Sequence, residues 1–78
     1  MAQIFVLSGP DAGKSFTIKG GDAVGRSPEC IVTLRHASVS RHHAHFEEQG
    51  GRWFAVDDGS RNGLIVDHKR VQRLELTD

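Results

Sequence analysis

The chain has 78 residues, enough for one small domain and too few for a nucleotide-binding fold with a second layer of helices. Its ten Lys and Arg residues balance its ten Asp and Glu residues, so the formal net charge is zero. No overall electrostatic field therefore draws the chain toward nucleic acid or a membrane, and any basic patch must be local.

The cysteine content and the N-terminus indicate the compartment. Cys30 is the single cysteine, which excludes an intramolecular disulfide and argues against a thiolate metal site. The residues after Met1 lack a basic region followed by a long apolar run, and no stretch approaches the roughly 20 apolar residues of a membrane span. We therefore expect a soluble, cytoplasmic protein.

The first elements in chain order are two strands around a turn. Residues Gln3 to Leu7 are rich in Ile, Phe and Val and predict a buried strand that ends at the turn signal Gly9-Pro10. Residues 11–15 (DAGKS) suggest a phosphate-binding P-loop, but the first glycine of that motif would have to stand at Ser8. The next residues alternate as a strand does, so we expect a hairpin turn here.

The rest of the chain continues as short strands between turns. Alternating apolar residues predict strands around residues 32–34, 43–48 and 52–57, and the apolar run at 64–66 follows a tight polar loop. Gly50-Gly51 has the length and composition of a two-residue hairpin turn. Because no window shows a helical period, we predict one all-β domain, a sandwich or a barrel.

Three polar segments stand at strand ends. From Ile31 to Phe46 the chain contains two Arg and four His residues and no acidic residue. Within it, residues 38–44 place hydroxyl groups beside a guanidinium, which suits a bound oxyanion. The other two segments are Gly25-Arg26 and residues 60–63. Loops at one end of a β-sandwich converge although they lie far apart in sequence, so we expect the three segments to meet.

Taken in order, these segments carry a family pattern. Gly25-Arg26, then VSRHHA at residues 39–44, then DDGSRNG at residues 57–63 resembles the signature of the forkhead-associated (FHA) domain. The likeness runs from about Val24 to Val66, and the ordered trio is far more specific than any one piece. The resemblance implies an FHA-like β-sandwich of short antiparallel strands that binds phosphothreonine peptides.

The resemblance also assigns the binding residues. A phosphate monoester carries about −1.5 to −2 charge and three acceptor oxygens, so its recognition needs a fixed cation and several donors. By resemblance, Arg26 and Ser40 hold the phosphate and Arg41 assists them. Asn62 hydrogen-bonds the peptide backbone beside the phosphothreonine. Arg61 stands where the family commonly has a small hydroxyl residue; it either adds charge toward the phosphate or reaches acidic residues that flank it.

Supporting roles follow from the same resemblance. A glycine positions the phosphate-binding arginine at a strand end, and a histidine braces the serine loop through local hydrogen bonds. A second serine and a second glycine shape the loop that carries the asparagine. These supporting residues are Gly25, His43, Ser60 and Gly63.

Enzymatic interpretations are less consistent with the residues. His42, His43 and His45 suggest a metal cluster, but along a strand at most two of them could ligate together, and no third ligand is evident. Ser40 is not in a GxSxG motif, and nothing places an Asp behind a particular His. We therefore expect no catalytic residue, no metal site, no cofactor and no enzymatic activity.

The C-terminus departs from the family. FHA domains continue with two closing strands after the position where this chain stops, so we expect residues 1–78 to be a single domain that lacks its last two strands. The missing strands would leave the edge of the first strand unpaired, which favours a strand-exchanged oligomer or one completed by another chain.

We predict a non-catalytic module that binds a phosphothreonine-containing protein in a Ser/Thr kinase pathway. The main alternative is a phospho-independent interaction module of the same fold, which equal binding of phosphorylated and unphosphorylated ligands would favour. A small nucleic-acid binder that uses residues 35–45 is a further alternative. The neutral net charge and the lack of an aromatic residue in that loop argue against it.

Overall fold

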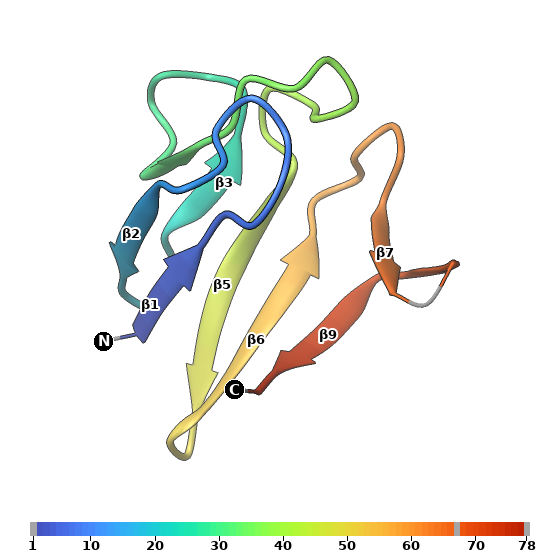
Figure 1. Ribbon diagram of the computed structural model, residues 1–78. Helices are drawn as coiled ribbons and strands as arrows, with labels where there is room; N and C mark the ends of the chain where they lie inside the picture. Colours follow the sequence, from blue (N-terminus) through green and yellow to red (C-terminus); the bar gives the residue numbers. More distant parts are fainter. Residues whose placement is uncertain (1, 67, 78) are drawn as a thin grey trace.

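The computed structural model describes residues 2–66 and 68–77, and these form nine short strands in three sheets (Figure 1). The strand order is β1–β2 in the first sheet, β4–β3–β5–β6–β9 in the second and β7–β8 in the third. All neighbouring strands pair antiparallel except β3 and β4. The strands are β1 (Ala2–Phe5), β2 (Ser15–Ile18), β3 (Ala23–Gly25), β4 (Val32–Thr33), β5 (Ala44–Gln49), β6 (Arg52–Asp57), β7 (Leu64–Val66), β8 (Lys69–Val71) and β9 (Arg73–Leu76). The predicted all-β class is confirmed.

The hairpin of β5 and β6 is the centre of the larger sheet. Gln49 pairs with Arg52, so the connection has two residues, Gly50 and Gly51. Their φ angles are 58° and 79°, and positive φ at both central positions is what a tight hairpin turn of this kind requires. The two-residue turn predicted from sequence is confirmed.

The core lies between the β1–β2 hairpin and one face of the five-stranded sheet. Ile18 on β2 and Val32 on β4 are fully buried, and they cluster with Phe46 on β5 and Ala55 on β6. Removing these apolar side chains from water is the main stabilising contribution to the fold. Partly buried residues surround the cluster: Ala2, Ile4, Phe16, Val24, Leu34, Trp53, Leu64 and Leu76.

The expectation of a buried first strand is wrong. The burial of β1 alternates, and the strand ends at Phe5 rather than at Leu7. Phe5 is 63% exposed and Leu7 is 91% exposed. An unbroken apolar run is typical of a strand covered on both faces, but only one face of β1 rests on the core. Strands β8 and β9, which are rich in Lys, Arg and Glu, were not predicted from the sequence.

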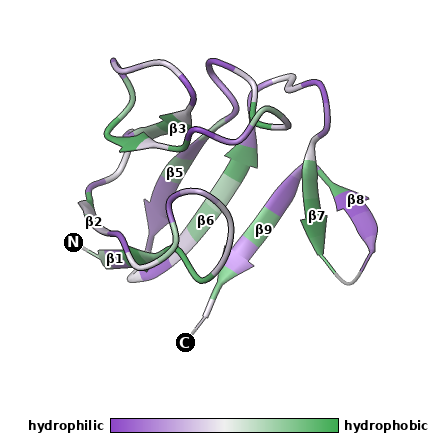
Figure 2. Cartoon of the chain, turned by 45° about the horizontal axis from the view of Figure 1, so that its top comes forward, coloured by the Kyte–Doolittle hydropathy of each residue, from purple (hydrophilic) through white to green (hydrophobic). Residues whose placement is uncertain are grey.

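Four loops gather at one end of the molecule, the upper end in Figure 1. They comprise residues 6–14, 26–31, 34–43 and 58–63, and Figure 2 shows hydrophilic residues along them. β3 and β6 end here and β5 begins here, because β5 runs antiparallel to both neighbours. In the described part of the chain, no helix is long and apolar enough to cross a membrane.

Candidate functional site

The end of β3 lies against the loop between β4 and β5. The backbone N–H of Arg26 donates to Ser40 O at 3.0 Å, and the N–H of Ser27 donates to Arg41 O at 3.1 Å. Gly25 is buried between them, and a Cβ at this position would collide with the carbonyl oxygen of Arg41. The close approach of two backbones therefore explains why this position is a glycine.

The loop between β6 and β7 contacts the same β4–β5 loop. The N–H of Arg61 donates to Ser40 Oγ at 3.0 Å, and Asn62 Nδ2 donates to Ser38 O at 2.6 Å. These bonds join residues 21 and 24 positions apart in the chain. Together with the contacts of β3, they bring the three polar segments of the sequence into one surface.

Arg26 and Ser40 both retain donor groups for a ligand. Arg26 is exposed, and its Nε donates to Val39 O at 2.6 Å, which orients the guanidinium plane and leaves its other N–H groups available. The Ser40 oxygen accepts the Arg61 N–H, and no described residue accepts the Ser40 hydroxyl proton. An oriented cation beside a hydroxyl donor is the arrangement that a phosphate monoester requires.

The loop end carries more positive than negative charge. Arg26, Arg41 and Arg61 are exposed, and none of them forms an ion pair with a carboxylate of a described residue. The nearby His42 Nε2 lies 3.8 Å from a carboxylate oxygen of Glu29. The three guanidinium groups therefore create a local positive potential on a chain whose net charge is zero.

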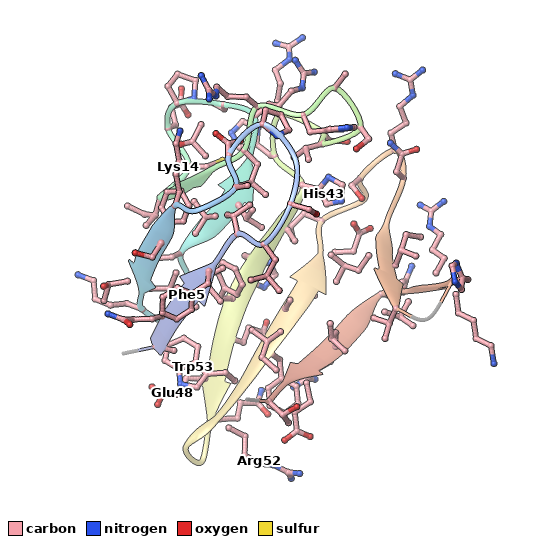
Figure 3. All side chains as sticks on the ribbon, in the orientation of Figure 1. Phe5, Lys14, His43, Glu48, Arg52 and Trp53 are labelled. Carbon is pink, nitrogen blue, oxygen red and sulfur yellow. The ribbon has the colours of Figure 1, made fainter. Side chains whose placement is uncertain are left out.

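His43 connects the Ser40 loop to the Asn62 loop. Its side chain is buried, and Figure 3 shows it beneath the upper loops. Nδ1 accepts the Ser40 N–H at 3.0 Å, so in the neutral ring the proton lies on Nε2, which donates to Gly63 O at 2.8 Å. Both bonds end on backbone groups, so His43 fixes the spacing of the two loops and keeps its own nitrogens away from the surface.

Asp57 organises the β6–β7 loop. Its carboxylate accepts the N–H groups of Gly59 and Ser60, each at 3.2 Å, and the hydroxyl of Ser60. The Ser60 oxygen in turn accepts the Gly63 N–H at 2.8 Å. The Ser60 hydroxyl and these amides lower the pKa of Asp57, which keeps it ionised. Asp57 had no predicted role, although an Asp side chain that accepts the backbone N–H two residues further along the chain is a known turn feature.

A second carboxylate, Asp11, ties the β1–β2 loop to the segment after β4. It is 3% exposed and accepts the backbone N–H of Arg35 at 2.7 Å, Arg35 Nε at 3.0 Å and Lys14 Nζ at 2.9 Å. The Arg35 N–H and the Lys14 ammonium lower the pKa of Asp11 to about 2. Residues 11–14 thus belong to the turn between β1 and β2, as expected, but no local pattern indicates that Asp11 has a partner 24 positions away.

The histidines make separate contacts. His45 Nδ1 lies 2.7 Å from Asp58 Oδ1, and its Nε2 lies 2.9 Å from Glu47 Oε2. The hydrogen bond to Glu47, followed by the one to Asp58, raises the pKa of His45. Among the residues that the structure describes, no group of three or more His, Cys, Asp or Glu side chains is placed to hold a metal ion.

Comparison with known proteins identifies the family. Residues 23–78 match the family model of the FHA domain. The chain therefore belongs to the FHA family, and its β-sandwich fold is that of the solved FHA domains. One of these, from a structural and functional study of phosphothreonine-dependent FHA domain interactions, matches with a TM-score of 0.76 and 27% identity, covering 88% of this chain and 73% of that one.

Curated relatives include regulatory proteins. The chain is 36% identical over 78 residues to the glycogen accumulation regulator GarA of Mycolicibacterium smegmatis, covering 99% of this chain and 49% of that protein. It is 38% identical over 69 residues to the oxoglutarate dehydrogenase inhibitor of Corynebacterium jeikeium, covering 87% and 48%. The chain spans about half the length of these curated relatives. The first relative is named as a regulator and the second as an inhibitor, and neither name describes a reaction that the protein catalyses.

Proposed function

We propose that this FHA domain binds phosphothreonine in partner proteins of a Ser/Thr kinase pathway. The observation that carries the proposal is the pairing of an oriented, uncompensated guanidinium with an available hydroxyl: Arg26 and Ser40 lie on adjoining loops whose backbones are hydrogen-bonded to each other. Charge-assisted hydrogen bonds of this kind are about twice as strong as neutral ones. The solved FHA domain studied for phosphothreonine-dependent interactions supports the same ligand.

In the proposed complex different residues bind the phosphate, the peptide backbone and the flanking residues of the ligand. The guanidinium of Arg26 pairs with two phosphate oxygens, and the hydroxyl of Ser40 donates to the third. Asn62 uses its side-chain carbonyl and its remaining N–H to hydrogen-bond the peptide backbone. Arg41 and Arg61 add positive charge at the rim, where Arg61 also attracts acidic residues that flank the phosphothreonine.

The domain acts by recognition alone. The proposed contacts need only side chains and backbone groups of this chain, so binding requires no cofactor and no catalytic residue. The partner is a protein that a Ser/Thr kinase has phosphorylated, which places the domain in the cytoplasm. Cys30, a buried free thiol whose pKa is raised by desolvation, is compatible with the reducing conditions there.

We also propose that residues 1–78 act as one folding unit that accepts a further strand at the edge of β1. Among the described residues, β1 pairs only with β2. An apolar groove of about 470 Å³ lies beside it, lined by residues that include Ile4, Phe5, Trp53 and Leu76. An unpaired edge next to exposed apolar side chains favours strand addition, here by a second copy of the chain. Light scattering tests this: association that rises with concentration supports it, and a monomer throughout contradicts it.

An amide NMR titration tests the binding function. The chain is titrated with three degenerate peptide libraries, one with a central phosphothreonine, one with phosphoserine and one unphosphorylated. We expect the amide signals of Arg26, Ser40, Arg41 and Asn62 to shift with the phosphothreonine library only. Equal shifts with the unphosphorylated library would instead indicate a phospho-independent module, and no shift with any library would refute ligand binding at this site.

A further inference from the structure

The side chain of Arg70, on β8, reaches the loop that carries Asn62. Its Nη2 donates to Ser60 O at 3.1 Å, across ten positions of the chain. Among the described residues, β8 pairs only with β7, so this contact links the outlying β7–β8 hairpin to the binding loops (Figure 2). We propose that Arg70 is a positioning residue that fixes the β6–β7 loop so that Asn62 meets the peptide backbone. This inference rests on the proposed function and extends it to a residue that does not touch the ligand.

The carbonyl group of Ser60 depends on Arg70 for its hydrogen bond. Ser60 is 6% exposed, so water has little access to it. In the part of the chain that the structure describes, Arg70 is the only donor to the Ser60 carbonyl oxygen. A buried carbonyl that loses its partner pays the cost of desolvation without a replacement. Loss of the Arg70 guanidinium therefore favours a loop conformation in which this carbonyl turns toward water.

The stem of Arg70 packs against the other end of the same loop. A Cβ on Gly63 would collide with Nε and Cγ of Arg70, so the arginine stem occupies the space that a side chain at Gly63 would need. The Gly63 N–H donates to Ser60 Oγ at 2.8 Å, and its carbonyl accepts His43 Nε2 at 2.8 Å. One side chain thus contacts both Ser60 and Gly63, the two residues that enclose Arg61 and Asn62.

The ligand-binding groups of Asn62 depend on this stretch of backbone. Asn62 is exposed, and its side chain makes one hydrogen bond to a described residue, from Nδ2 to Ser38 O at 2.6 Å. The side-chain carbonyl and the remaining N–H are therefore placed by the backbone between Ser60 and Gly63. Because hydrogen bonds weaken steeply as their distance and angle depart from the optimum, a small shift of this backbone weakens the contacts that Asn62 makes with a peptide.

A direct contact with the ligand is the competing role for Arg70. The residue is exposed, and it forms no ion pair with a carboxylate of a described residue. Its guanidinium could in that case attract an acidic residue of the peptide. The two roles differ in one respect: a positioning residue acts through Asn62, whereas a direct contact is independent of Asn62.

A double-mutant cycle distinguishes the two roles. Arg70→Met keeps an unbranched apolar stem and removes the donors. Fluorescence anisotropy measures the affinity for the phosphothreonine peptide that the unaltered chain binds most tightly. We expect Arg70→Met to weaken binding about threefold, and Asn62→Ala and the double variant each about tenfold, because both substitutions remove the same contact. An additive loss of about thirtyfold in the double variant would show that Arg70 acts independently of Asn62, and would overturn the inference.

Two further variants complete the test. Lys69→Ala removes the same charge at the neighbouring exposed position of β8 and should bind as the unaltered chain does. A loss with Lys69→Ala as large as that with Arg70→Met would attribute the effect to net charge and refute the positioning role. Arg70→Lys should recover part of the affinity lost in Arg70→Met, because an ammonium still donates to the Ser60 carbonyl.

The outcomes keep the inference apart from the proposed function. If the unaltered chain and Arg70→Met bind phosphothreonine peptides equally well, Arg70 is not a positioning residue but the proposed function stands. If no phosphothreonine peptide binds the unaltered chain, both fail. Thermal unfolding checks that each variant is folded. Should Arg70→Met not fold, Arg70→Lys takes its place: it must lose affinity by itself and lose none in the Asn62→Ala background, and any other result refutes the inference.

Discussion

Removing the guanidinium of Arg26 is the most direct test of the phosphate site. In the proposed complex Arg26→Ala removes a bidentate ionic contact with the phosphate. Truncating one partner of such a charge pair costs about 2–5 kcal/mol of binding free energy. We expect a value near the lower end because Arg26 is exposed and partly screened by water. A loss of about 2.8 kcal/mol corresponds to a hundredfold weaker affinity. Arg26→Lys should recover part of the loss, because an ammonium keeps the charge without the planar fork.

Isothermal titration calorimetry with the tightest member of the phosphothreonine library measures the effect. Arg52→Ala is the matched control, because it removes the same charge at the hairpin turn far from the loop end, where Arg52 pairs with Glu75 at 2.9 Å. This control should bind nearly as the unaltered chain does. Thermal unfolding of each variant excludes misfolding as the cause. An affinity for Arg26→Ala within threefold of the unaltered chain would refute the assignment of the phosphate to this residue.

Two further predictions concern stability. Gly25→Ala places a Cβ against the Arg41 carbonyl and should lower the free energy of unfolding in urea by about 1–3 kcal/mol. Gly20→Ala, whose Cβ meets only ordinary contacts, should change this free energy little. Equal effects of the two substitutions would contradict the close approach of Gly25 to Arg41. The raised pKa of His45 stabilises the fold below about pH 6.5, and this contribution is lost as the pH rises through the folded-state pKa. The stability advantage over His45→Gln should therefore be larger at pH 6 than at pH 9, by less than about 1 kcal/mol, and a pH-independent difference would argue against the charged pair.

Local patterns in the sequence were sufficient for much of the fold. The alternation of apolar and polar residues predicted β6 at Arg52–Asp57, and a short apolar run predicted β7 at Leu64–Val66. Gly50-Gly51 predicted the hairpin turn between β5 and β6. These features depend on residues a few positions apart, whose backbone preferences and turn chemistry act within one segment. The FHA pattern was also visible, because its glycine, arginine, serine and asparagine keep their order and spacing along the chain.

The contacts between segments were decided by the tertiary structure. Alternation could not show that β1 is covered on one face only, since that depends on which strands lie beside it. The bond from Asp11 to the Arg35 backbone and the approach of Gly25 to Arg41 join segments whose separation depends on the path of the whole chain. The sequence by itself determined where β6, β7 and the turn between β5 and β6 form, and which residues carry the family's pattern. Only the folded chain decided how Arg26 is oriented and how the Ser40 and Asn62 loops meet, because both result from contacts between loops distant in sequence.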